Sequence, residues 1–255
     1  MSLLRRLVLL PLGAALLAPV AHAQTAVGDD EVKAGFSQNV EVDFVSDYVF
    51  RGISNSNENY ALQPSYTANW TQHNGNTLSL GVWASTLDPE SQVEHEVDLW
   101  GTYAFSTSFA DFSASYTWYS YPGSPEDSDL SFGEFQLTAG KDLGSVYLNG
   151  EYDFSPDYFG GTGDAHYVSL ALNTNDGVMP GGLVLSGHVG HQWFDDNATF
   201  GAPDYTDGGL RLERTWHWLT AGLEASTTDI DDADCFGGAD ICGSRVFATL
   251  GIATP

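Results

Sequence analysis

Carboxylate side chains recur at alternate positions along several stretches of this chain. Glu41 and Asp43 show the spacing first, and Glu96 and Asp98 repeat it further on. Alternate residues of a β-strand lie on one face, so the spacing predicts strands that each carry a charged row. Rows of carboxylates raise the local concentration of cations and line the filters of cation channels. We predict the charged face to consist of Glu41, Asp43, Asp47, Arg51, Glu94, Glu96, Asp98, Glu134, Glu151, Asp153, Asp207, Arg211, Glu213 and Glu224.

Arg51 is one of the few basic residues on this acidic face. It falls near the end of the first expected strand, where its guanidinium could brace Asp47 or Asp207 through paired hydrogen bonds. One interpretation is a constriction or selectivity residue in a pore. The other is a structural ion pair, and the sequence leaves both open.

The remaining reactive side chains form no specific catalytic or metal motif. His188 and His191 have the spacing H-x-x-H, but an offset of three places them on opposite faces of a strand. The aspartates of residues 229–234 resemble a calcium loop without the glycine at its sixth position or the glutamate at its twelfth. Neither G-x-S-x-G nor H-E-x-x-H occurs. We therefore expect no enzyme, no catalytic residue, no metal and no cofactor.

Two cysteines, Cys235 and Cys242, lie close together near the end of the chain, with the pair Gly237-Gly238 between them. Disulfides form in exported proteins, and this spacing suits a small closed loop. We predict a Cys235–Cys242 disulfide.

The charge balance excludes one class of partner. The chain has 34 acidic and 8 basic residues, a formal net charge of −26. Nucleic-acid binding needs basic patches that neutralise phosphates, so we expect no nucleic-acid partner. An acidic balance keeps a protein soluble, and it can also create an interior that attracts cations.

Residues 39–54 alternate between apolar and polar side chains, which predicts a strand with two different faces. Val40, Val42, Phe44, Ser46, Tyr48 and Phe50 fall on one face, and Glu41, Asp43, Asp47 and Arg51 fall on the other. In a soluble sandwich the apolar face would point inward. In an outer-membrane barrel the apolar face meets lipid and the charged face lines the interior.

The rest of the chain favours the barrel. Similar alternation recurs in about twelve segments, each near the length that crosses a bilayer at a tilt. Their connections alternate between long, as at 52–59, and short, as at 73–76. Aromatic residues mark both ends of the segments, with Tyr48 and Phe50 at one end and Trp70 at the other. The predicted fold is all-β, a transmembrane up-and-down antiparallel β-barrel of residues 38–255, without a plug domain.

The first 23 residues have the pattern of a cleaved signal peptide. Arg5 and Arg6 precede an apolar run that ends at the small-x-small site Ala21-His22-Ala23. Residues 24–37 are polar, and we predict a periplasmic tail. The chain is thus expected to be exported to the outer membrane of a Gram-negative bacterium.

One stretch is similar to a known family. Phe44-Val45-Ser46, followed by Asp47-Tyr48-Val49-Phe50-Arg51-Gly52-Ile53-Ser54, resembles the opening motif of the proteobacterial TorF-type porin family. The resemblance implies an outer-membrane barrel of similar length whose transported solutes are largely undefined. Elsewhere the likeness is one of strand layout rather than of particular residues.

Three functions remain open at this stage. The first is passive diffusion of small hydrophilic solutes or ions, with cations preferred, in contact with outer-membrane lipids and lipopolysaccharide. The second is a structural or adhesive barrel whose interior is closed by ion pairs. The third is a barrel hydrolase, which would need a histidine such as His95 or His166 beside Ser91 or an aspartate.

Overall fold

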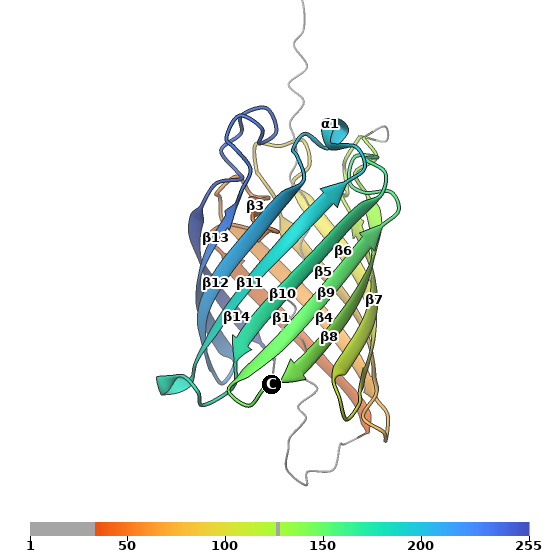
Figure 1. Cartoon of the computed structure of the whole chain (residues 1–255), viewed down its shortest axis with the longest axis vertical. Helices are drawn as coiled ribbons and strands as arrows, with labels where there is room; N and C mark the ends of the chain where they lie inside the picture. The colour runs from red at the N-terminus through yellow and green to blue at the C-terminus, as the bar shows by residue number, and fades with distance from the viewer. Residues whose placement is uncertain (1–33, 126–127, 255) are drawn as a thin grey trace, which may run out of the picture.

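The computed structural model describes residues 34–125 and 128–254, which form one closed antiparallel β-barrel (Figure 1). Twelve strands follow one another around the wall, and the ring closes where β1 pairs with both β4 and β14. The wall strands are β1 (Gly35–Val45), β4 (Ala61–Thr71), β5 (Thr77–Thr86), β6 (His95–Ser106), β7 (Asp111–Ser120), β8 (Phe132–Asp142), β9 (Val146–Ser155), β10 (Ala165–Thr174), β11 (Leu183–Phe194), β12 (Tyr205–Trp216), β13 (Leu219–Thr228) and β14 (Arg245–Ala253). The predicted fold class is confirmed.

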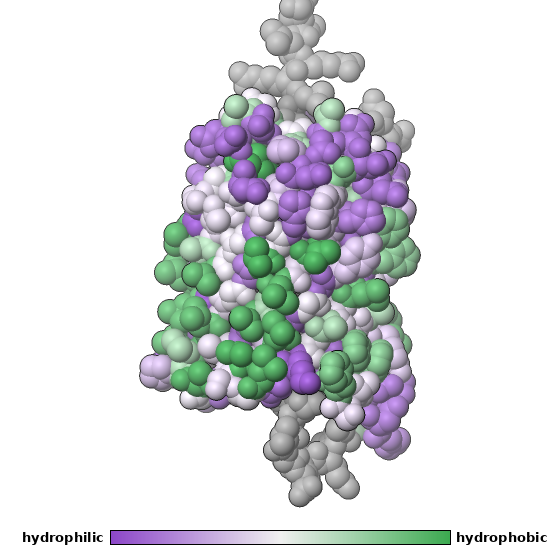
Figure 2. All heavy atoms as spheres, in the orientation of Figure 1, coloured by the Kyte–Doolittle hydropathy of each residue, from purple (hydrophilic) through white to green (hydrophobic). Residues whose placement is uncertain are grey.

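The apolar faces of the strands point outward. Val40, Phe44 and Leu80 are 44%, 47% and 48% exposed, although they are large aliphatic or aromatic residues. Figure 2 shows hydrophobic residues along the middle and lower part of the wall and hydrophilic residues around the upper end. Exposing such a wall to water is unfavourable, whereas contact with lipid acyl chains is favourable. The prediction of a barrel is therefore confirmed, and the alternative of a soluble sandwich is wrong.

The connections alternate in length as the sequence predicts. At the upper end of Figure 1 they span 46–60, 87–94, 121–131, 156–164, 195–204 and 229–244. At the lower end they span 72–76, 107–110, 143–145, 175–182 and 217–218. The short helices are η1 (Pro180–Gly182) in a lower connection and α1 (Asn197–Phe200) in an upper one. Within the described ranges, no helix is long and apolar enough to span a membrane.

The expected strand of residues 39–54 is wrong in its second half. β1 ends at Val45, and the following residues form a separate hairpin of β2 (Val49–Phe50) and β3 (Ile53–Ser54). Arg51 and Gly52 form its turn with φ of 43° and 81°, and a two-residue turn with both φ positive matches strand twist. A Cβ on Gly52 would lie 2.4 Å from Thr228 Cγ2, so only glycine fits.

This hairpin folds into the barrel. We call residues 46–60 the inward loop, because Asp47, Arg51 and Asn55 are all buried within the wall. The loop belongs to the barrel domain itself and fills the upper part of the interior, which the sequence did not predict. Tyr48 and Phe50, predicted to face lipid, are buried inside instead.

A hydrophobic cluster closes the upper end of the interior. It joins the inward loop to the other upper connections and to inward residues of the strand ends, including Phe50, Trp83, Tyr158, Phe200 and Phe236. Phe194 and Phe200 stack with ring centroids 3.8 Å apart. We call this cluster the outer cap. Its side chains exclude water from the upper interior, which strengthens the electrostatic contacts beneath it.

The N-terminal predictions lie mostly beyond the part that the structure describes. The signal peptide, residues 1–23, and most of the tail, residues 24–37, precede residue 34. Gly35 to Ser37 are not tail but the start of β1, paired with Asn69 to Thr71 of β4.

Leu170→Arg should destabilise the barrel in lipid. Leu170 lies at the middle of β10, is 51% exposed and faces outward, and an arginine at the bilayer midplane costs about 2–4 kcal/mol. The neighbouring Ser169→Arg places the same charge on the inner face beside Glu151 and should cost less. Urea unfolding in phospholipid vesicles measures both. Equal losses for the two variants would contradict the assigned faces.

Candidate functional site: the barrel interior

Arg51 lies at the centre of the upper interior. Its Nη1 donates to Glu134 Oε2 at 3.1 Å and to Gln192 Oε1 at 2.8 Å. Its Nη2 donates to Glu134 Oε1 at 2.9 Å and to Asp153 Oδ2 at 2.7 Å. These acceptors belong to β8, β9 and β11, across the barrel from β1. The inward loop is therefore attached to the far wall by a charged side chain.

Aromatic rings and burial complete this site. The Arg51 guanidinium lies 4.1 Å from the ring centroid of Tyr167 and 4.7 Å from that of Phe50, distances typical of cation–π contacts. The side chains of Arg51, Glu134 and Asp153 are 1%, 5% and 0% exposed. Burial disfavours the charge on Arg51, but Glu134 and nearby groups outweigh it and hold the guanidinium pKa well above its ordinary value.

The predicted partners of Arg51 are wrong. Asp47 instead accepts from Arg245 Nη1 at 3.2 Å and from the hydroxyls of Ser54 and Ser56 at 2.5 and 3.0 Å. Asp207, the other predicted partner, accepts from the Tyr167 hydroxyl at 3.0 Å. In one continuous strand, Asp47 and Arg51 would have lain on the same face. The reversed direction of the hairpin carries Arg51 to the opposite wall.

A second contact holds the inward loop to β6. The Tyr48 hydroxyl donates to Glu96 Oε2 at 3.0 Å, and the Tyr121 hydroxyl donates to Glu96 Oε1 at 3.2 Å. Glu96 and Asp98 are both fully buried on the inner face, as predicted. Glu94 precedes β6 and is exposed, so its predicted place in the interior is wrong. Glu94 lies before the first residue of β6, so the inward–outward alternation of that strand does not apply to it.

The lower interior is less tightly packed. Arg211 Nε donates to Glu213 Oε2 at 2.8 Å, and its Nη1 lies 3.5 Å from Glu224 Oε2. Asp43 lies on the inner face over Gly251, where an added Cβ would meet Asp43 Oδ1 at 2.3 Å. The charged residues that are only partly buried are Glu41, Asp43, Glu151, Arg211, Glu213 and Glu224.

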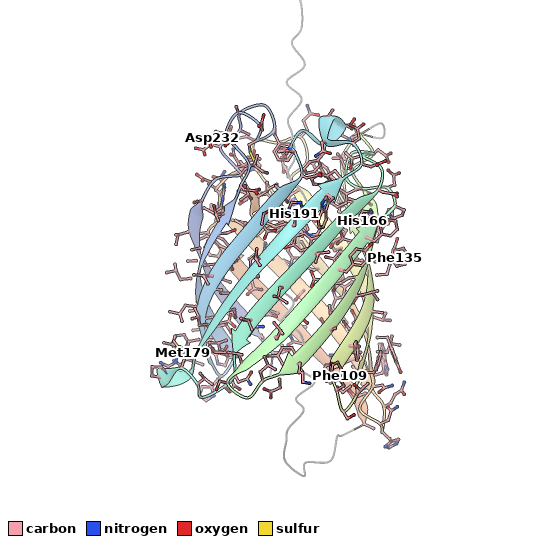
Figure 3. The ribbon with its side chains drawn as sticks, viewed as in Figure 1. Phe109, Phe135, His166, Met179, His191 and Asp232 are labelled. Atoms are coloured by element: carbon pink, nitrogen blue, oxygen red, sulfur yellow. A yellow bond between two sulfur atoms is a disulfide. The ribbon has the colours of Figure 1, made fainter. Side chains whose placement is uncertain are left out.

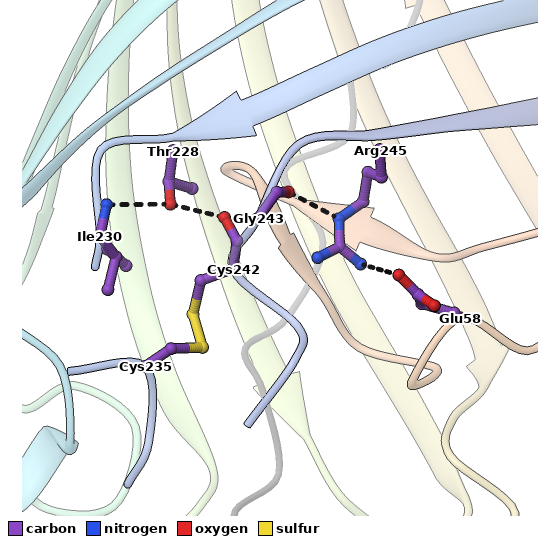
Figure 4. Close-up of a disulfide and its surroundings, with 7 residues drawn as sticks. All are labelled: Glu58, Thr228, Ile230, Cys235, Cys242, Gly243 and Arg245. Carbon is purple, nitrogen blue, oxygen red and sulfur yellow. Dashed lines mark hydrogen bonds and ion pairs between the residues drawn. A yellow bond between two sulfur atoms is a disulfide. The ribbon is translucent and has the colours of Figure 1, made fainter. Parts of the chain in front are cut away.

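The predicted disulfide is present in the structure (Figure 4). Cys235 and Cys242 close a loop in the connection between β13 and β14, with Cα atoms 6.0 Å apart. The loop contacts its surroundings through the backbone of Ile241, which accepts from Ser54 N–H at 2.9 Å, and through Thr228 Oγ1, which donates to the Cys242 carbonyl. The disulfide thus fixes one side of the outer cap against the inward loop.

His188, His191 and the acidic loop of residues 229–234 lie apart from one another in the described structure. His188 Nε2 lies 2.9 Å from Asp207 Oδ2 inside the barrel, whereas His191 contacts Thr206 and the Trp193 ring. Figure 3 shows His191 near the upper strand ends and Asp232 in the connection above them. Among residues 34–125 and 128–254, no three metal-ligating side chains come together.

Two candidate members of a hydrolytic site are engaged elsewhere. His166 Nδ1 is 2.9 Å from the Tyr152 hydroxyl. The Ser91 hydroxyl donates to the Val93 carbonyl. These contacts provide no nucleophile–base pair between His166 and Ser91.

Sequence reasoning missed Tyr167, Gln192 and Tyr48 as members of the interior site. The alternation of the strands places Tyr167 and Gln192 on the inner face, but their contact with Arg51 depends on where the inward loop carries Arg51. The available signal was the Arg51-Gly52 pair between Val49-Phe50 and Ile53-Ser54. A glycine at the second position of a two-residue turn between short β-prone segments is a hairpin signal.

A family model matches residues 29–248 and is described as a bacterial protein of unknown function (Gcw_chp). The chain belongs to the Gcw_chp family. The match covers nearly all of the described barrel, and it does not carry the TorF-type name, which stays a resemblance. No curated protein matches this Gcw_chp chain.

Solved structures share the fold of this Gcw_chp protein. The NanC porin has a TM-score of 0.55 at 10% identity, with 86% of this chain and 100% of that chain covered. The KdgM porin has a TM-score of 0.53 at 7% identity, covering 85% and 98%. An outer-membrane channel from Pseudomonas putida F1 has 0.52 at 12%, covering 89% and 97%. At these identities the likeness shows the fold alone.

Proposed function

We propose that this chain is an outer-membrane channel for passive diffusion of small hydrophilic solutes, with cations preferred. The observation that carries the proposal is the acidic inner face of a closed, apolar-walled barrel. Arg51, Arg211 and Arg245 are the arginines that form ion pairs in the described interior. They are outnumbered by the inward carboxylates, so the interior attracts cations. The fold shared with porins supports the proposal.

The membrane assignment has its own support. The outward faces are apolar at mid-height, and the upper connections are hydrophilic (Figure 2). Exposed Trp118 and Trp193 lie toward one end of the wall, and exposed Trp70 and Tyr103 lie toward the other. Such aromatic belts are typical of bilayer interfaces. The proposed location is therefore the outer membrane, with lipids and lipopolysaccharide around the wall.

Conductance in planar bilayers tests the channel. In a KCl gradient, folded protein should give a reversal potential whose sign shows that K+ permeates more readily than Cl−. Glu41→Gln together with Asp43→Asn should reduce that preference, because both carboxylates lie on the inner face. The control neutralises Asp231 and Asp232, which lie in an exposed upper connection and should matter less where salt screens them. No conductance from folded protein, or preference for chloride, would refute the proposal.

A second candidate function is a closed structural barrel. The outer cap and the buried Arg51 contacts favour it, because both obstruct the interior. This candidate expects no conductance from folded protein under any applied voltage, whereas the channel expects openings when the inward loop leaves the interior. Among residues 34–125 and 128–254, His166 and Ser91 are engaged elsewhere and form no nucleophile–base pair, and we propose that the chain has no catalytic activity.

A further inference from the structure

The wall of the barrel holds the Arg51 guanidinium in a site of defined shape. We infer that this wall site binds guanidinium and amidinium cations as a class, and that the chain's own Arg51 occupies it as a tethered ligand. The inference rests on the proposed channel function in one respect, since an external cation would reach the site through the interior. It goes beyond that function because it names the chemical class of the ligand.

The hydrogen bonds define which part of the cation is recognised. The four N–H bonds of the two terminal nitrogens are directed at Glu134, Gln192 and Asp153, between 2.7 and 3.1 Å. Arg51 Nε is buried and makes none of these hydrogen bonds, and the Tyr158 hydroxyl is the polar group beside the guanidinium. The site therefore recognises the planar pair of terminal amino groups, not the substituted nitrogen. Every monoalkyl guanidinium and every amidinium presents this fork, whereas an ammonium does not.

Two wall residues of the site, Tyr167 and Gln192, are held in place without the inward loop. Tyr167 lies over Gly190, where a Cβ would meet its hydroxyl oxygen at 2.0 Å, and its hydroxyl donates to Asp207 Oδ1 at 3.0 Å. The Gln192 amide nitrogen donates to the His166 carbonyl at 3.0 Å, which turns Oε1 toward the guanidinium. Tyr167 and Gln192 are thus preorganised, and preorganisation reduces the cost of binding.

Removal of Arg51 should leave a receptor that lacks its cation. Glu134 and Asp153 would remain buried on the wall without a positive partner, which is strongly unfavourable. A soluble guanidinium that enters would restore the same hydrogen bonds. In the native chain the tether gives Arg51 an effective concentration in the millimolar range or above. A free ligand must compete with it, and a ligand that succeeds releases the inward loop.

The test uses full-length Arg51→Ala folded in detergent, with ethylguanidinium as the probe and ethylammonium as the comparison. Calorimetry and thermal unfolding at millimolar ligand should show ethylguanidinium binding at least about tenfold more tightly than ethylammonium. Wild-type protein should bind it about tenfold more weakly than Arg51→Ala, because the tethered side chain competes. Arg51→Ala with Asp153→Asn should lose most of the binding.

Arg245→Ala is the matched control. Arg245 Nη1 contacts Asp47 at 3.2 Å and Glu58 at 3.6 Å and has no fork-shaped receptor, so its removal should create no preference for ethylguanidinium. If Arg51→Ala does not fold alone, its folding yield with each cation becomes the measurement, and a gain with ethylguanidinium only is expected.

Equal effects of the two cations, or binding that persists in the Asp153→Asn double variant, would overturn the inference. Its failure is separable from failure of the channel, since binding needs no conductance. Selective binding without conductance refutes only the proposed channel, and conductance without selective binding refutes only the guanidinium site.

Discussion

Replacing residues 47–56 with a short Gly-Ser segment is expected to raise the single-channel conductance about tenfold or more, because the replaced hairpin fills the upper interior. The replacement removes Arg51, Tyr48 and Phe50 from the interior and opens the outer cap from within. Val45 pairs with Ala61 at the ends of β1 and β4, so a short turn can join the two strands without changing their register.

Planar-bilayer recording of the purified variant measures this effect. The control places the same Gly-Ser segment at residues 176–181, in the longest lower connection, where no hairpin enters the interior. Retained β-sheet circular dichroism and heat-modifiable migration establish that both variants fold. Unchanged conductance from the folded 47–56 variant would show that the inward loop does not obstruct the passage, and would contradict this prediction.

Glu134→Gln is expected to lower the free energy of unfolding by about 3 kcal/mol, because it removes one partner of a buried ion pair. Both Glu134 oxygens accept from Arg51, at 3.1 and 2.9 Å. Glutamine keeps the shape but directs an amide N–H₂ at the guanidinium. The remaining partner, Asp153, cannot replace the paired geometry that Glu134 supplies.

Urea unfolding in vesicles measures this loss, and urea is chosen because guanidinium chloride would itself supply the proposed ligand. The matched control is Glu213→Gln, which weakens a pair with Arg211 whose side chains are 24% and 29% exposed. Water and salt screen that pair, so its loss should cost less than about 1 kcal/mol. Replacing both buried partners, with Arg51→Met and Glu134→Leu, should recover part of the stability. Equal costs for the two glutamine variants would contradict a buried ion pair at Arg51.

The local pattern of residues was enough to predict the wall. Val40, Phe44 and Leu80 face outward, and Glu41 and Asp43 face inward, because the two faces of a strand are set by alternation within the strand itself. The alternation of long and short connections can likewise be read from the sequence, because each connection joins two consecutive strands. The sequence by itself therefore determined an up-and-down barrel and the faces of most of its residues.

Only the tertiary structure decided what fills the barrel. Residues 46–50 alternate equally well in a longer transmembrane strand and in a hairpin that folds inward. The hairpin is selected by partners distant in sequence, with Glu134, Asp153 and Gln192 lying 83, 102 and 141 positions from Arg51. A carboxylate row predicts a charged face, but it does not predict which carboxylate a guanidinium meets. That choice depends on the path of one loop across the closed barrel, and the path exists only after the ring has closed.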